Sequence, residues 1–129
     1  MAPATLVSRE IEEGQRLIVA LNSAGLYTES ALWIYSSDSE TWRLMLTSPL
    51  CDSDGSLEAY KQILSVFRGI KPELKIDWTG IVAVSPTHDL IEGLRQLQLL
   101  WELDLSGKRL VNNMVNMILV EDSHIYRIK

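Results

Sequence analysis

The chain has 129 residues, of which 47% are hydrophobic and 22% are charged, and its formal net charge at pH 7 is −5. This length and apolar content fit one globular domain and exclude a disordered or fibrous chain. The single cysteine excludes an internal disulfide, and no apolar run approaches the ~18 residues of a membrane span.

The first helix is predicted from apolar residues that recur at steps of three and four. They are Val7, Ile11, Gly14, Ile18 and Leu21. A glycine within this stripe lowers helix propensity by about 1 kcal/mol relative to alanine, which close packing of Gly14 against another element would explain. Gly25 stands where a left-handed C-terminal cap is expected.

Two β-rich runs, residues 29–36 and 41–47, predict a hairpin with its tip at Asp38–Ser39. In this register, three cross-strand pairs form a core-facing side: Ala31 with Leu46, Trp33 with Leu44, and Tyr35 with Trp42. The opposite side carries Leu32, Ile34 and Met45 and is too apolar for plain solvent exposure. Either the chain's own helices cover this side, or it is an interface for a protein partner or a second copy.

A second helix is predicted from Ser56, after a loop over residues 49–55. Its apolar stripe is Leu57, Tyr60, Leu64 and Phe67, and Gly69 and Pro72 end it. A short buried strand is expected over residues 81–84. A third helix should begin at Ser85–Pro86, with the stripe Leu90, Leu94, Leu97 and Trp101.

The last segment, residues 110–128, has β character and is apolar on both sides, which is typical of a central strand. Its turn is expected at Asn112–Asn113 or at Glu121–Ser123. The element order is then α-β-β-α-β-α-β-β. We therefore predict a single α+β domain over residues 1–129, with packed helices and a mixed or antiparallel sheet.

Ser85, His88 and Asp89 have the residue types of a nucleophilic triad, but they stand too close together along one helix start to supply its geometry. A helix cap accounts for them. Cys51 could pair with a histidine as a thiolate. However, its neighbours Asp52 and Asp54 raise a thiol pKa, so a passive cysteine is favoured.

Metal ligands are offered by Glu121, Asp122 and His124, with His88 as the other histidine. A site needs three or four converging groups, which this spacing does not ensure. The run Asp52–Gly55 matches only part of a calcium loop and is interpreted as a turn. We therefore assign no catalytic residue, metal or cofactor.

Basic residues concentrate in residues 59–78 and 106–129, whereas the first 58 residues are strongly acidic. A nucleic-acid-associated protein would need the basic side chains on one face; they are Lys61, Arg68, Lys71, Arg109 and Arg127. Trp33, Tyr35 and Trp42 could stack on bases, but their flanks are acidic. Nucleic-acid binding is therefore not favoured.

Three stretches of the sequence resemble other proteins, and they are ALWIYSSDSETWRLMLTSPL, GIVAVSP and EDSHIYRI. Together they resemble a group of small uncharacterised prokaryotic α+β proteins, over the range from Glu29 to Ile128. The resemblance implies a stand-alone prokaryotic domain and carries no activity or site residue.

The leading hypothesis is a non-enzymatic cytoplasmic module for protein–protein interaction, which could form a homodimer, with Leu32, Ile34 and Met45 as the candidate interface. The cytoplasmic expectation follows from the N-terminus, where Glu10, Glu12 and Glu13 stand instead of the regions of a secretory signal. One alternative is a small hydrolase-like enzyme that uses His88 or His124 with carboxylates. The other is the nucleic-acid-associated protein.

Overall fold

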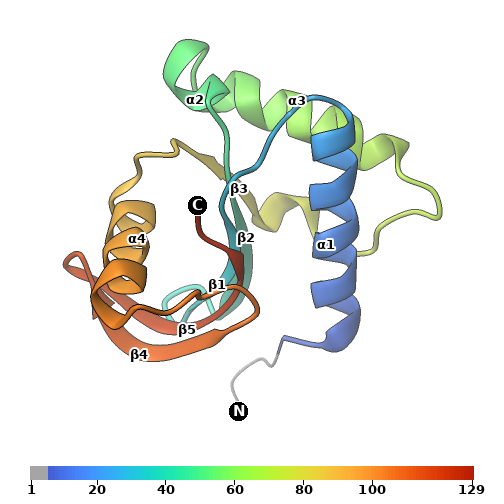
Figure 1. The fold of residues 1–129 in the computed structure, drawn as a ribbon. Coiled ribbons are helices and arrows are strands. Elements are labelled where there is room, and N and C mark those ends of the chain that lie inside the picture. The colour runs from blue at the N-terminus through green and yellow to red at the C-terminus, as the bar shows by residue number, and fades with distance from the viewer. Residues whose placement is uncertain (1–5) are drawn as a thin grey trace.

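The computed structural model describes residues 6–129 and contains one five-stranded sheet with helices on both faces (Figure 1). The helices are α1 (Ser8–Ser23), α2 (Leu50–Ser53), α3 (Ser56–Gly69) and α4 (Asp89–Trp101), with a 3₁₀ turn η1 (Trp78–Gly80). The strands are β1 (Ala31–Ser36), β2 (Thr41–Thr47), β3 (Ile81–Val84), β4 (Arg109–Val115) and β5 (Ile118–Arg127). The predicted α+β class and element order are confirmed, with α2 and η1 as additions.

The sheet is mixed and has the strand order β3-β2-β1-β5-β4. The β2–β3 pair is parallel and the other pairs are antiparallel. The predicted hairpin register is confirmed, because Tyr35 pairs with Trp42 and Trp33 pairs with Leu44. The last strand, β5, lies between β1 and β4, so its predicted interior position is correct. The two sides are not equally buried, because Met117 and Leu119 are 91 and 54% exposed whereas Val120 is buried.

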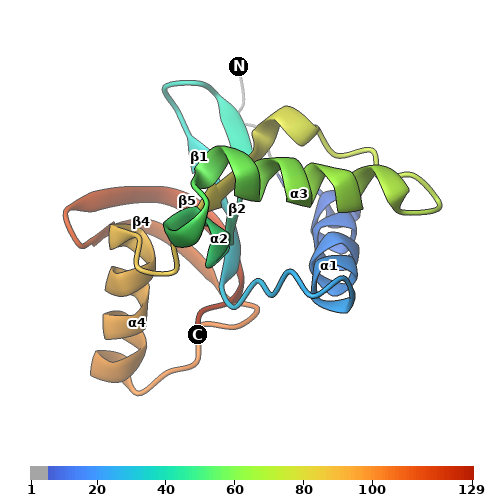
Figure 2. The same cartoon turned by 90° about the horizontal axis from the view of Figure 1, so that it is seen from above.

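The sheet separates two hydrophobic cores. Helices α1 and α3 lie over one face and α4 lies over the other (Figures 1 and 2). Adjacent β1 residues point to different cores: Trp33 belongs to the α1 side and Leu32 to the α4 side. This is the period-two alternation of a strand that is buried on both faces.

The hairpin side that carries Leu32, Ile34 and Met45 is covered by the chain itself. Leu32 is only 1% exposed and lies in the core beneath α4. Ile34 and Met45 are partly buried against the same core. Of the two alternatives for this side, the structure therefore shows internal cover, and the three residues do not form an open surface.

All three predicted helix stripes are wrong at one end, and in the first of them Val7, which precedes α1, is 46% exposed. Leu57, in the first turn of α3, is 67% exposed, and the buried residues of that helix are Ala59, Ile63 and Leu64. Trp101, the last residue of α4, is 46% exposed. Trp101 is the last residue of α4, whereas Leu57 lies in the first turn of α3 beside the edge strand β3 and is mostly exposed there.

The third predicted helix begins later than expected. Residues 85–88 form a turn in which the His88 N–H donates to the Ser85 carbonyl at 3.0 Å, and α4 starts at Asp89. Pro86 therefore precedes the helix instead of standing in its first turn.

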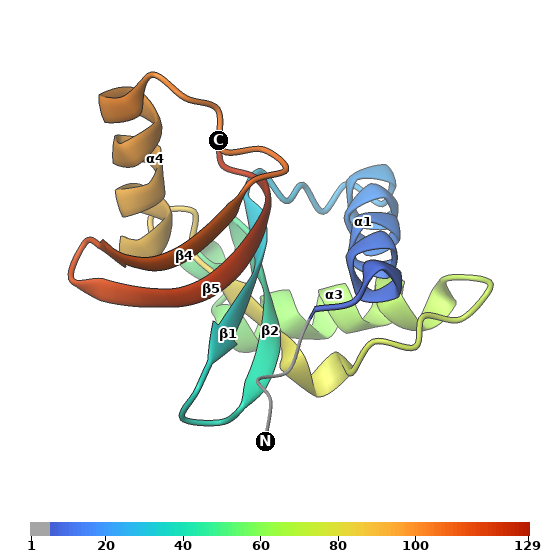
Figure 3. The same cartoon turned by 90° about the horizontal axis from the view of Figure 1, so that it is seen from below.

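The turn between β4 and β5 is formed by Asn116 and Met117, not by Asn112–Asn113 or Glu121–Ser123 as predicted. Both turn residues have positive φ, 49° and 68°, which is the geometry of a tight type I′ hairpin turn. Glycine is the usual second residue of such a turn, so methionine gave no turn signal. The hairpin extends past β1 and curves toward α4 (Figure 3).

Gly14 lies on α1 where the helix approaches the sheet most closely. A Cβ at this position would stand 2.2 Å from the Tyr126 hydroxyl and 3.1 Å from Trp33 Nε1. That hydroxyl accepts from Trp33 Nε1 at 2.8 Å and donates to the Ile11 carbonyl at 2.6 Å. The predicted reason for Gly14, close packing, is therefore correct.

Candidate functional site

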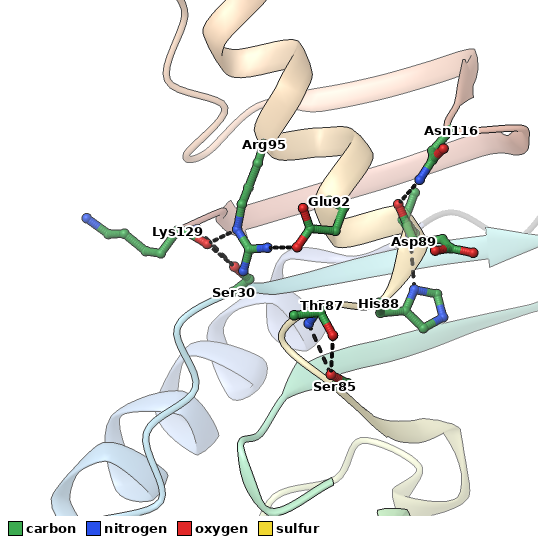
Figure 4. Close-up of polar contacts among 10 residues, drawn as sticks. Ser30, Ser85, Thr87, His88, Asp89, Glu92, Arg95, Asn116 and Lys129 are labelled. Carbon is green, nitrogen blue, oxygen red and sulfur yellow. Dashed lines mark hydrogen bonds and ion pairs between the residues drawn. The ribbon is translucent and has the colours of Figure 1, made fainter. Parts of the chain in front are cut away.

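The Ser85–Asp89 segment forms a helix cap (Figure 4). The Nδ1 atom of His88 accepts from the Leu90 N–H at 3.1 Å and caps α4. The Ser85 hydroxyl accepts from the Thr87 N–H at 3.1 Å and bonds the Thr87 hydroxyl at 2.9 Å. These contacts use the serine and the histidine separately, so the segment is built as a cap and not as a nucleophile with its base.

His124 lies on the other face of the sheet from His88. It pairs across the strands with Trp33 and stacks edge-on against Tyr126, with ring centroids 5.3 Å apart. Burial lowers the pKa of His124, and burial also raises the pKa of Tyr126 to about 12. The two histidines therefore cannot converge on one site.

The carboxylates near His124 have partners of their own. Asp122 accepts from Arg109 through both oxygens, at 2.9 and 2.7 Å, and this arginine holds the pKa of Asp122 below its usual value. Glu121 accepts from the Ser37 N–H at 2.8 Å. Within residues 6–129, no three histidine, cysteine or acidic side chains are grouped so that they could hold a metal ion.

Cys51 is half-buried in the short helix α2. Burial is the largest cause that raises its pKa, and Asp52 raises it further, while a hydrogen bond involving Ser56 works in the opposite direction. A raised pKa keeps the thiol protonated and weakens it as a nucleophile.

The basic side chains do not form one patch. Lys61 and Arg68 lie on α3, which contacts β3 at one edge of the sheet, whereas Arg109 lies on β4 at the other edge. Arg127 donates to the backbone carbonyls of residues 28 and 29. The clustering that a nucleic-acid surface requires is absent from this set of five.

A concentrated group of exposed apolar side chains lies at the C-terminal end of α4. It comprises Leu99, Leu100, Trp101 and Leu103, which are 80, 77, 46 and 42% exposed, and we call it the α4 end surface. Single exposed leucines are ordinary, but four large exposed apolar side chains within five residues are a concentration of the kind found at interaction sites, and two of them, Leu99 and Leu103, line one groove.

The α4 end surface is held rigidly on the fold. Gln98 donates to the Ile128 carbonyl at 3.1 Å and accepts from the Leu105 N–H at 2.9 Å. Arg95 donates to the Lys129 carbonyl, and its other branch bonds Glu92 at 2.8 Å (Figure 4). These contacts fix the end of α4 to the end of β5.

A groove of about 450 Å³ runs beside the α4 end surface. Its apolar lining is Leu99, Leu103 and Ile128, and its charged lining is Arg95, Asp104 and Lys129. The ridge next to it carries Glu102, which is exposed. Arg95 is already paired with Glu92, so the free charges of the groove are Lys129 and Asp104, and the exposed apolar side chains of the α4 end surface stand beside it.

The sequence does indicate the α4 end surface, because the leucines of this region are more numerous than the single sheet-facing stripe of α4 requires. Leu90, Leu94 and Leu97 account for the side of α4 that faces the sheet, whereas a further set of leucines continues the apolar character onto a second side. That set is Leu99, Leu100 and Leu103. A helix that is apolar on two sides needs a second partner or leaves one side exposed.

Comparison with known proteins yields no match: no family model fits the chain, and no curated protein or solved structure is significantly similar to it. Among the described residues, no helix is both long and apolar enough to cross a bilayer. The chain's own surface is therefore what indicates its function.

Proposed function

We propose that the protein is a non-enzymatic module for protein–protein interaction and that it pairs with a second copy of itself through the α4 end surface. The observation that carries this proposal is the exposure of Leu99 and Leu100, at 80 and 77%. Burial of a leucine side chain contributes about 1.5–3 kcal/mol, so these residues offer a strong driving force for association.

The shape of the surface suits a two-fold dimer. In an isologous interface each copy presents the same patch, so the patch must contain both a projection and a recess. The α4 end surface has both, because its leucine ridge stands beside the 450 Å³ groove. A partner's Leu100 can enter the groove while its own groove receives the Leu100 of the first copy.

The charges support the same pairing. The groove carries Arg95 and Lys129 against Asp104, and the ridge carries Glu102. In the proposed dimer, Glu102 of one copy pairs with Lys129 in the groove of the other.

Glu102 is also unfavourable within its own chain. It caps α4 with a left-handed φ of 49°, where glycine is preferred, and its charge stands at the negative end of the helix dipole. An intermolecular ion pair gives this glutamate a favourable contact that the single chain does not provide.

The first experiment is light scattering after size exclusion, over a range of protein concentrations. We expect the wild-type protein to have twice the 14.6 kDa mass of the chain. Leu100→Glu should leave it monomeric without loss of folding, because this side chain is exposed. Leu57→Glu is the matched control, an equally exposed leucine on α3, and should leave the dimer intact. A monomeric wild-type protein refutes the proposal.

A charge exchange tests the orientation. Glu102→Lys should raise the dissociation constant of the dimer about three- to tenfold, since exposed ion pairs are individually weak. Addition of Lys129→Glu to that chain should restore affinity. A dimer that is unaffected by Leu100→Glu would place the interface elsewhere.

A further inference from the structure

The strand β3 is the unprotected edge of the sheet. It pairs with β2, and no other strand among residues 6–129 lies beyond it. Its sequence, Ile81–Val84, contains no charge, proline or bulge. Charges, prolines and bulges are features with which proteins prevent an edge strand from pairing with another chain, and of these devices β3 has only its short length of four residues.

The opposite edge is different. Strand β4 carries two asparagines in its middle, and Asn112 has a left-handed φ of 52°. The ladder with β5 is interrupted there, since the residues on either side, Val111 and Asn113, pair with β5 and Asn112 does not. The backbone of β4 is therefore unsuited to continuous pairing, and β3 is the edge at which another strand can add.

A groove of about 290 Å³ runs along β3. One wall is formed by Thr79 and by the edge residues Ile81, Val82 and Ala83. The other wall is formed by Ser56, Leu57 and Tyr60 at the start of α3. Leu57 is 67% exposed. Its apolar side chain can therefore contact a segment that binds along β3.

The approaches to this groove are acidic. Asp52 and Asp54 precede the α3 wall, Asp77 precedes Thr79, and all three are exposed. No ion pair within the described part of the chain involves them. The lining itself contributes one basic residue, Arg43.

We infer that the β3 edge binds an extended, cationic segment of a partner protein, which adds to the sheet as a sixth strand beside β3. Main-chain hydrogen bonds supply the pairing, and alternate side chains of the added strand face the groove, where Leu57 and Tyr60 receive an apolar residue. Basic residues of the added segment approach Asp54 and Asp77, which stand two residues before the lining residues Ser56 and Thr79. This surface is separate from the α4 end surface, and its occupation does not depend on dimer formation.

The test uses a defined probe, an eight-residue peptide of alternating lysine and valine, titrated into the isotopically labelled full chain at low salt. We expect the largest amide shifts in residues 79–84 and at Leu57. Two control peptides of the same length separate the contributions. Alternating glutamate and valine reverses the charge, and the lysine–valine peptide N-methylated at every residue keeps the charge but has no backbone N–H to donate on either edge. Both controls should fail to produce these shifts.

A matched pair of variants tests the acidic approaches. Asp52→Lys with Asp54→Lys should weaken binding of the lysine–valine peptide about tenfold. Glu12→Lys with Glu29→Lys makes the same change of charge at exposed positions outside the groove and should weaken it by less than about twofold. Absence of shifts in residues 79–84 at millimolar peptide, or equal binding of the N-methylated peptide, would overturn the inference.

Discussion

Substitution of Gly14 by alanine tests the close packing of α1 against the sheet. The added methyl group cannot occupy its position while the Tyr126 hydroxyl stays where it is, since the two would be 2.2 Å apart. The hydroxyl must move, and it then leaves both Trp33 Nε1 and the Ile11 carbonyl. The tyrosine ring must shift as well, because its ring carbon Cζ would lie only 3.0 Å from the added methyl group.

The expected cost follows from these contacts. Two partly buried hydrogen bonds contribute about 1 kcal/mol each, and a donor left without a partner adds about 1 kcal/mol. The higher helix propensity of alanine stabilises the folded protein by about 1 kcal/mol relative to glycine. The free energy of unfolding should therefore fall by about 2 kcal/mol in Gly14→Ala.

Urea unfolding, followed by circular dichroism and tryptophan fluorescence, measures this change. Gly69→Ala is the control, because Gly69 also lies in a helix but a methyl group added there would have nothing within 4 Å; it should be neutral or stabilising. In a Tyr126→Phe background the clash with the hydroxyl is gone, so Gly14→Ala should cost less than about 1 kcal/mol. A Gly14→Ala protein as stable as Gly69→Ala would refute the reasoning.

Two further predictions concern the hairpin and pH. Met117→Gly should raise the free energy of unfolding by about 0.5–1 kcal/mol in urea, because Met117 holds a φ of 68° while its side chain is 91% exposed; a loss of stability would contradict this. Because burial lowers the folded-state pKa of His124, its contribution to stability is present above the unfolded pKa of about 6.5 and lost as pH falls through the folded value. The loss of stability on acidification should be smaller in His124→Gln, and an unchanged pH profile would contradict the shift.

Local patterns in the sequence were sufficient for the elements and for the first hairpin. Period-two alternation indicated which residues of β1 and β2 face each other, because a slip of one residue would have placed Trp33 and Leu44 on opposite faces of the sheet. The β4–β5 turn was predicted at the wrong residues because another pair nearby is a more common turn sequence. Asn112–Asn113 is the more usual turn pair, and the structure uses Asn116–Met117 instead.

Long-range contacts were beyond prediction from a single sequence. Glu13 stands among the acids of the N-terminal segment, yet it is 7% exposed and accepts from the Ile76 N–H at 2.9 Å, 63 residues away. The exposure of Trp101 depends in the same way on where α4 ends relative to the sheet. A helical stripe could not predict the α4 end surface, because it indicates which side is apolar but not how far the sheet extends beneath it.

The central position of β5 determines when the fold can be completed during synthesis. Strand β1 obtains its first neighbour, β2, within a few residues, but its second neighbour spans Ile118–Arg127. Until that segment leaves the ribosome, one edge of the β1–β2 hairpin has no strand to pair with, and Leu32 lacks Ile125, its partner on β5. The five-stranded sheet therefore cannot be completed before residues 118–127 are synthesised, and a chain that lacks them leaves the β1–β2 hairpin with an unpaired edge and part of its apolar face uncovered.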